Sequence, residues 1–212
     1  MDAFAISPSN IASLVIALSF AAGLNVYATV CTLGILARMD WVVLPGNLGT
    51  LEHTWIIAVS GLLFLAELVG DKIPGFDLIW NALHTFIRIP AAALMAYAAS
   101  SHLSPEQQLL VTLAGGTIAA IAHSSKTAAR VLVTPSPEPV SNIALSSAED
   151  VGAIGLTWVA THHPMAAGIS VAALSVVLVA ALWWTFARIR TGLTGIFRRR
   201  SDPSDPAHRA LP

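Results

Sequence analysis

The stretch LLFLAELVGDK, residues 62–72, places a glutamate inside an apolar run and closes the run with an Asp–Lys pair. A run this apolar is typical of a helix in lipid, where an ionised side chain is costly and marks a substrate or ion pathway. Glu67 must therefore face the interior of a helix bundle, pair with a cation or carry a proton. The charges of the chain as a whole are also rare, at 11% of residues, and they gather in two stretches between apolar runs.

The composition is that of a membrane protein. Hydrophobic residues make up 55% of the chain and the mean hydropathy is +0.71, whereas a soluble domain has about 25% charged residues. We therefore expect an all-α, polytopic transmembrane bundle whose partners include membrane lipids. The net charge of −1 and the lack of a basic face outside the C-terminal tail argue against nucleic acid as a partner. We expect no cofactor.

A spanning helix needs about 20 apolar residues, and the sequence offers about six candidate spans. They are expected at residues 11–36, 55–70, 76–101, 105–130, 146–160 and 165–187. Ser104, Pro105 and Gln107 form a helix start, and Ser146 with Glu149 resembles a capping box. Two polar loop or half-helix segments interrupt the spans. One is the turn after Gly70, and the other holds three alternating prolines over residues 135–142, which predict extended backbone.

The lysines and arginines predict the orientation. Six crossings with both termini in the cytoplasm place ten of the eleven basic residues inside and only Arg38 outside. Residues 1–190 then form a single transmembrane domain, and residues 191–212 a basic interfacial and disordered tail. Residues 23–47 loosely parallel residues 122–142, which suggests a 3+3 inverted repeat. The short third and fifth segments suggest shelter by neighbouring helices, as a homo-oligomer would provide.

The first charged stretch predicts contacts between two helices. Glu67 and Asp71 are four residues apart, as are His84 and Arg88, so each pair shares a helix face. The tight turn that begins at Lys72 folds the second of these helices back along the first. We therefore expect Arg88 to face Glu67 or Asp71.

The second charged stretch adds a basic stripe. His123, Lys126 and Arg130 lie at i, i+3 and i+7 on one helix face. Glu138, Ser141 and Asn142 follow in the proline-rich segment, and Glu149 and Asp150 are expected in the first turn of the next helix. Asn25 lies in a run of small residues. It either stabilises helix packing by a hydrogen bond across an interface or belongs to the site. For the isolated Asp77, Arg88 and Asp150, ion pairs that only hold the fold are the preferred interpretation, whereas Glu67, His123 and Lys126 are preferred as site residues.

Five motifs together resemble an uncharacterised bacterial integral-membrane family that is a domain of unknown function. They are AGLNVY (22–27), GDKIPG (70–75), HTFIRIP (84–90), AHSSK (122–126) and SPEPVSN (136–142). The resemblance covers most of residues 10–190. It implies a multi-span protein of the bacterial inner membrane and brings no activity, substrate or cofactor.

Four functions are compatible with these residues. The first is a transporter or flippase for an anionic small molecule or lipid headgroup that bears phosphate. Its expected substrate-binding residues are Asn25, Lys72, His84, Arg88, His123, Lys126, Arg130, Ser141 and Asn142. Its expected charge-balancing or proton-coupling residues are Glu67, Asp71, Glu138, Glu149 and Asp150.

The other three functions use the same residues differently. An intramembrane enzyme acting on a lipid phosphate would use the histidines as acid and base, but no recognised catalytic spacing is present and no catalytic residue is assigned. A cation pathway would use the acids, and there the bases repel cations unless each is paired. A structural partner of another membrane protein is the fourth. Whether the acids hold a metal is open.

Overall fold

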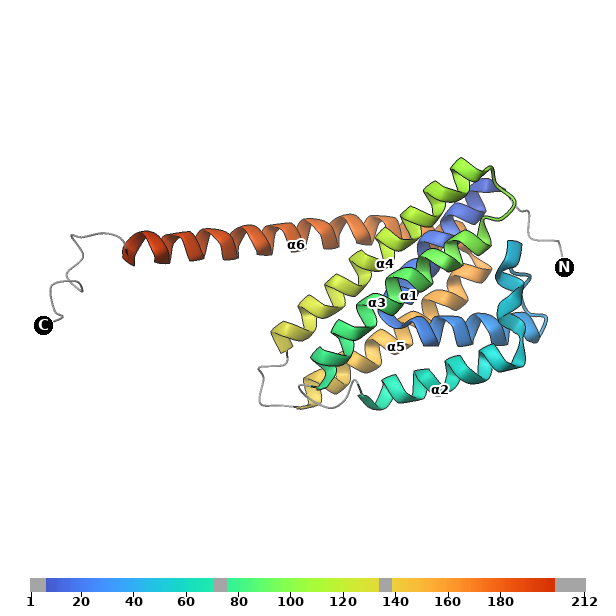
Figure 1. Cartoon of the computed structure of the whole chain (residues 1–212), viewed down its shortest axis with the longest axis horizontal. Coiled ribbons are helices and arrows are strands. Elements are labelled where there is room, and N and C mark those ends of the chain that lie inside the picture. Colours follow the sequence, from blue (N-terminus) through green and yellow to red (C-terminus); the bar gives the residue numbers. More distant parts are fainter. Residues whose placement is uncertain (1–6, 71–75, 134–138, 201–212) are drawn as a thin grey trace, which may run out of the picture. The chain divides into compact units, whose positions relative to one another are not determined.

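A computed structural model describes residues 7–70, 76–133 and 139–200, apart from the side chains at 76–78, 81, 132–133, 139, 142 and 189–200. These ranges are mainly helical and contain no strand, which confirms the all-α class (Figure 1). The elements are α1 (Pro8–Arg38), the 3-10 helix η1 (Gly46–Glu52), α2 (Thr54–Gly70), α3 (Phe76–Ala99), α4 (Pro105–Val133), α5 (Pro139–His162) and α6 (Pro164–Arg200).

The chain divides into two compact units, Met1–Ser175 and Val176–Pro212. The first unit holds α1 to α5 and the first turns of α6, and the second holds the rest of α6. The predicted division at residue 190, between a membrane domain and a tail, stays a prediction.

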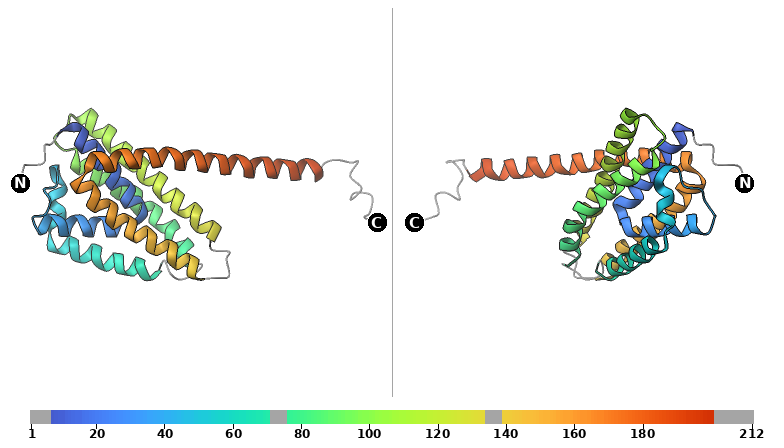
Figure 2. Two further views of the ribbon diagram at one scale, coloured as in Figure 1. Left: turned by 180° about the vertical axis from the view of Figure 1, so that it is seen from behind. Right: turned by 45° about the vertical axis from the view of Figure 1, so that its right-hand side comes forward.

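Helix α1 is the centre of the first unit. It contacts α2, α3, α4 and α5, while α3 packs along α4. Figures 1 and 2 show α1 between the α3–α4 pair and α5. Small residues permit this close packing, because a Cβ added at Gly23 would lie 2.6 Å from the Ala119 carbonyl oxygen and 2.7 Å from the Ala122 Cβ.

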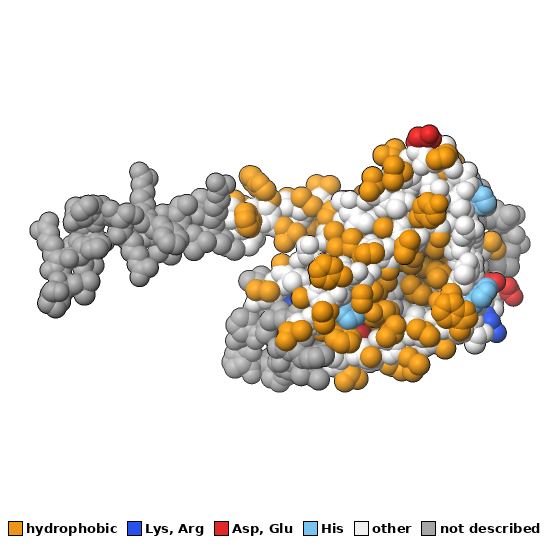
Figure 3. All heavy atoms as spheres, viewed as in Figure 1, with side chains coloured by type: hydrophobic (Ala, Val, Ile, Leu, Met, Phe, Trp, Pro, Cys, Tyr) orange, Lys and Arg blue, Asp and Glu red, His pale blue; other side chains and the backbone are white. Residues whose placement is uncertain are grey.

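The described surface of the first unit is largely apolar, and several charged side chains are buried in its interior. Phe86 is 81% exposed and Leu110 is 67% exposed, whereas Glu67, Arg88 and Arg130 are 0% exposed. Hydrophobic side chains cover much of the visible face of the first unit in Figure 3. A monomeric soluble protein rarely exposes so much contiguous apolar surface. The apolar helices therefore indicate a membrane protein.

Length and apolar character single out three helical segments that could cross a bilayer. They are Pro8–Arg38, Ala82–Ala99 and Pro164–Arg188, and the pair of η1 and α2, bent by 75°, would make a fourth if it is one span. The other helices of the described ranges do not meet the same test. The six predicted crossings and the inverted repeat are therefore not confirmed.

The start of α5 differs from the prediction. The helix begins at Pro139 rather than near Ser146, so residues 139–142 are helical and not extended, while 135–138 lie outside the described residues. The physical reason is that proline is well suited to the first helical position, where no backbone N–H is required. Ser146, Glu149 and Asp150 consequently lie in the body of α5, and the predicted capping box is wrong. The other predicted helix start is confirmed, with Ser104 and Gln107 bonding reciprocally.

Candidate functional site

A network of buried ion pairs joins four helices of the first unit. Glu67 lies one turn before the end of α2 and forms an ion pair with Arg88 from the middle of α3. Arg130, on α4, pairs with Glu149 on α5 at 2.6 Å. The predicted contact between Arg88 and Glu67 is thus confirmed.

Lys126 connects the two halves of this network. Its Nζ lies 3.6 Å from Glu67 Oε1 and 3.2 Å from Glu149 Oε2. It also donates a hydrogen bond of 3.0 Å to the backbone carbonyl of Leu24 on α1. A single ammonium group therefore contacts α1, α2 and α5 from its place on α4. Transfer of such charges out of water costs several kcal/mol per ion, so each must keep a counter-ion.

The Leu24 carbonyl is available because α1 is broken at the next residue. Asn25 has φ −151° and ψ 102°, which is not helical, and its side chain is fully buried. The Asn25 amide oxygen accepts from the Ala28 N–H at 2.9 Å, the contact of an N-cap residue. The Asn25 amide nitrogen donates to Asp150 Oδ1 at 2.9 Å. Asn25 thus starts the second half of α1 and ties it to α5.

His123 extends the network along α3. Arg88 Nη1 lies 3.2 Å from His123 Nδ1, and Thr85 Oγ1 lies 2.7 Å from His123 Nε2. Because a guanidinium can only donate, Nδ1 accepts and the ring proton resides on Nε2, facing Thr85. The imidazole is neutral in this arrangement.

His84 is buried beside the network. Its Nδ1 lies 2.7 Å from the Trp80 carbonyl oxygen, and its ring meets Tyr27 edge-on, with centroids 5.6 Å apart. Backbone and aromatic groups surround this ring in the described contacts.

The structure brings together eight of the predicted site residues. They are Asn25, Glu67, Arg88, His123, Lys126, Arg130, Glu149 and Asp150. Ser141 is half-buried near the start of α5. Asp71, Lys72 and Glu138, and the side chain of Asn142, lie outside the described residues.

The profile of a family described as domain of unknown function (DUF4126) matches residues 12–185. The chain belongs to this family. The match runs from α1 into α6 and includes every residue of the network. No curated protein and no solved structure shows a significant match to the chain.

The described charges of this DUF4126 protein balance one another at the network. Arg88, Lys126 and Arg130 oppose Glu67, Glu149 and Asp150. In the part of the chain that the structure describes, no group of three or more His, Cys, Asp or Glu residues is placed to hold a metal ion.

Two contributors to the network carried no signal in the sequence. The Leu24 carbonyl became an acceptor through the break in α1, and Thr85 lies beside His123 although it is 38 positions away. Thr85 lies within the motif HTFIRIP, but nothing in the motif indicates a contact with His123. Backbone acceptors leave no trace in a sequence.

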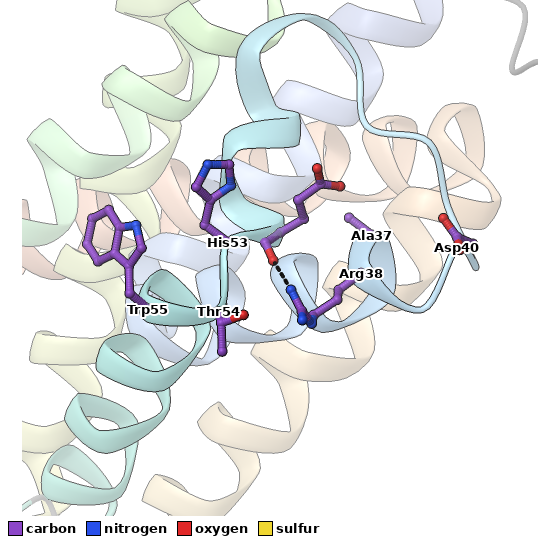
Figure 4. A pocket seen from close by; sticks show the side chains of 7 residues that line it. Ala37, Arg38, Asp40, His53, Thr54 and Trp55 are labelled. Carbon is purple, nitrogen blue, oxygen red and sulfur yellow. Dashed lines mark hydrogen bonds between the residues drawn. The ribbon is translucent and has the colours of Figure 1, made fainter.

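A separate open pocket of about 680 Å³ lies where α1, η1 and α2 meet (Figure 4). Its lining residues are Ala37, Arg38, Asp40, Glu52, His53, Thr54 and Trp55. Arg38 Nη1 donates to the Glu52 carbonyl oxygen at 3.4 Å. This pocket lies at the opposite end of α2 from Glu67.

Proposed function

We propose that this protein is a small transporter or flippase of the bacterial inner membrane for an anionic, phosphate-bearing substrate. The observation that carries the proposal is the buried network of Glu67, Arg88, Lys126, Arg130 and Glu149 within a bundle whose outer face is apolar. Buried ionisable groups in a membrane protein usually face a pathway or a binding site. Three bases from two helices suit an anion, and arginine suits phosphate in particular.

The break at Asn25 supports transport. Many transporters bind substrate where a helix is discontinuous, at the interface between two inverted repeats. The proposed repeat would set α1 to α3 against α4 to α6, and the α1 break then lies beside the charged face of α4 through the contact of Lys126 with Leu24.

The proposed topology has six crossings with both termini in the cytoplasm. Helices α4 and α5 have 29 and 24 residues, and about 20 residues suffice to cross the hydrocarbon core. Four of their charged residues, Lys126, Arg130, Glu149 and Asp150, are buried in the bundle, which lowers the hydropathy of these helices without exposing charge to lipid. The basic residues outside the network then follow the positive-inside rule, with only Arg38 outside, while Arg88, Lys126 and Arg130 are buried within the bundle.

The acids would supply counter-charge and coupling. In the closed arrangement Glu67 and Glu149 neutralise the bases. An arriving anion would compete with them, and a proton taken up by a carboxylate would free a base to hold the anion.

A second candidate, a proton or cation pathway, is favoured by one observation. Arg88, Lys126 and Arg130 all pair with a carboxylate. Paired bases present a weaker barrier to a cation than free ones, so the chief objection to this candidate is reduced.

The two candidates are separated by reconstituting the purified protein in liposomes. The probes are labelled inorganic phosphate, a fluorescent phosphatidic acid whose exposure is read by dithionite quenching, and a pH-sensitive dye in the lumen. Transport predicts movement of one of the phosphate probes, at least tenfold slower in Lys126→Gln and unchanged in Arg38→Gln. Dye response without phosphate movement favours the cation pathway, and chemical turnover without movement favours an enzyme.

A further inference from the structure

The two acids of the network each use one oxygen for two bases, and they differ in exposure. Glu67 is fully buried and pairs with Arg88, which is itself fixed by His123. Glu149 is 7% exposed, and a single oxygen, Oε2, serves both Lys126 and Arg130. The other oxygen, Oε1, is buried and has no hydrogen-bond partner among the described residues. A buried carboxylate oxygen without a donor costs free energy, so Glu149 is an incomplete ligand for these two bases.

A hydroxyl group with no partner lies one turn away on the same face of α5. Ser146 is 0% exposed, and its Oγ has no hydrogen-bond partner among the described residues. The buried Oγ atoms of Ser125 and Ser175 resemble it in this respect, whereas other hydroxyls in or next to the helices donate to the carbonyl four residues earlier. Examples are Ser60, Ser100, Thr127, Thr157 and Thr161. Ser146 therefore has a free donor and acceptor beside Glu149.

We propose that Lys126, Arg130 and Ser146 form a binding site for a tetrahedral oxyanion, and that Glu149 occupies this site in the closed arrangement. The inference rests on the proposed function, since it identifies which part of the network takes the anionic substrate. A phosphate group offers more acceptor oxygens and more negative charge than a carboxylate. It can bind the planar guanidinium at two points and the ammonium at a third.

The replacement of the Glu149 carboxylate by a bound anion depends on the charges around Glu149. Helix α4 contributes Lys126 and Arg130, α2 contributes Glu67, which shares Lys126, and α5 itself contributes Asp150. From α1 come the uncharged Leu24 carbonyl and Asn25 amide. Protonation of Glu149 would remove one negative charge from beside Lys126 and Arg130, so the site would attract an anion more strongly as pH falls. Binding of the anion would thus be linked to uptake of a proton.

The test measures anion binding rather than transport. Isothermal titration of the purified full-length protein with sulfate, whose charge does not change between pH 5.5 and 8, should give tighter binding at the acidic end. Glu149→Gln should bind sulfate at least tenfold more tightly than wild type at pH 8 and should lose most of the pH dependence. Ser146→Ala should weaken binding severalfold without lowering the melting temperature, because it removes a hydroxyl that has no partner among the described residues.

The matched control is Glu106→Gln, the same substitution at an exposed glutamate at the start of α4, which should behave as wild type. Titration with inorganic phosphate, and capture of the protein in nanodiscs with or without phosphatidic acid, then distinguish a free phosphate from a lipid headgroup. If Glu149→Gln binds sulfate no better than wild type, or Ser146→Ala leaves affinity unchanged, the site assignment is wrong even where liposomes show transport. Binding as expected with no transport upholds the site and rejects the transporter.

Discussion

At the scale of the residue, the ion pairs depend on one another because their partners are shared. Glu67 contacts both Arg88 and Lys126, and Glu149 contacts both Lys126 and Arg130. When one base is removed, each acid still contacts another base. The network therefore tolerates the removal of one base better than an isolated buried ion pair would. Removal of one partner from an isolated buried pair costs about 3–5 kcal/mol.

Arg88→Met tests this reasoning. We expect a loss of about 3 kcal/mol in the free energy of unfolding, at the lower end of the range for buried pairs, since Lys126 still reaches Glu67. The double variant Arg88→Met with Glu67→Gln should lose less than the sum of the two single variants, because neither charge is then left alone. The free energy of unfolding of the two single variants and the double variant is measured in mixed micelles.

The control for this series is Arg38→Met. Arg38 is exposed and makes one long hydrogen bond to a backbone carbonyl, so we expect a change below about 0.5 kcal/mol. An equal loss in Arg38→Met and Arg88→Met would show that the buried network contributes nothing specific to stability.

At the scale of the element, the break in α1 is an organised feature. Asn25 caps the second half of the helix, and Lys126 satisfies the last carbonyl of the first half. Such backbone is tolerated in a membrane only where protein or water satisfies it. Two polar side chains on different helices therefore maintain the break.

Asn25→Ala should lose both functions of the side chain. Loss of the cap costs about 1–2 kcal/mol, and loss of the donor to Asp150 adds about 1–3 kcal/mol for a buried acceptor. Asn25→Ser keeps an oxygen for the cap and should fall between wild type and Asn25→Ala. Equal melting temperatures for the alanine and serine variants would contradict the capping role.

The packing of α1 on α4 gives a second prediction at this scale. Gly23→Ala should destabilise the fold by about 1–3 kcal/mol, because its Cβ would overlap the Ala119 backbone. Gly155→Ala on α5 is a matched control. No atom lies within 4 Å of its added Cβ, so the higher helix propensity of alanine should leave stability unchanged or slightly raised. If both variants behave alike, close packing at Gly23 is not a determinant of the fold.

The sequence predicted the elements better than it predicted their partners. Apolar runs located the six α-helices of the described ranges, because helices packed against one another or against lipid need long hydrophobic segments. The start of α5 was misplaced, since proline at position 139 opens a helix where a run of prolines suggested extended chain. The contact of Arg88 with Glu67 followed from their spacing. The joining of Glu67 to Glu149 through Lys126 did not, because it depends on how α2 and α5 pack against α1 and α4.

At the scale of the whole molecule, the first unit buries six of its described charged side chains and exposes a largely apolar surface; the six are Glu67, Arg88, Lys126, Arg130, Glu149 and Asp150. The same arrangement that would be unstable in water is stable in lipid, where apolar side chains need no burial and charged ones require partners. A bundle of this kind either encloses a pathway or uses its ion pairs only as structural links. The accessibility of the interior to water decides between these possibilities.

The proposed topology can be checked with reporters. A reporter that is active only in the cytoplasm should be active when fused after residue 212 and inactive when inserted between Met39 and Gly46, next to Arg38. Activity at both sites would rule out the orientation derived from the basic residues and require a different number of crossings.

The most direct test of the account is the reactivity of two introduced cysteines in a Cys31→Ala background toward a membrane-impermeant thiol reagent. Val151 is 70% exposed on α5, and Ser146 on the same helix is 0% exposed. If the outer face lies in lipid and the interior opens to water during transport, Ser146→Cys reacts, is protected by phosphate, and Val151→Cys does not react. A reactive Val151→Cys beside an inert Ser146→Cys would contradict both the membrane setting and the pathway.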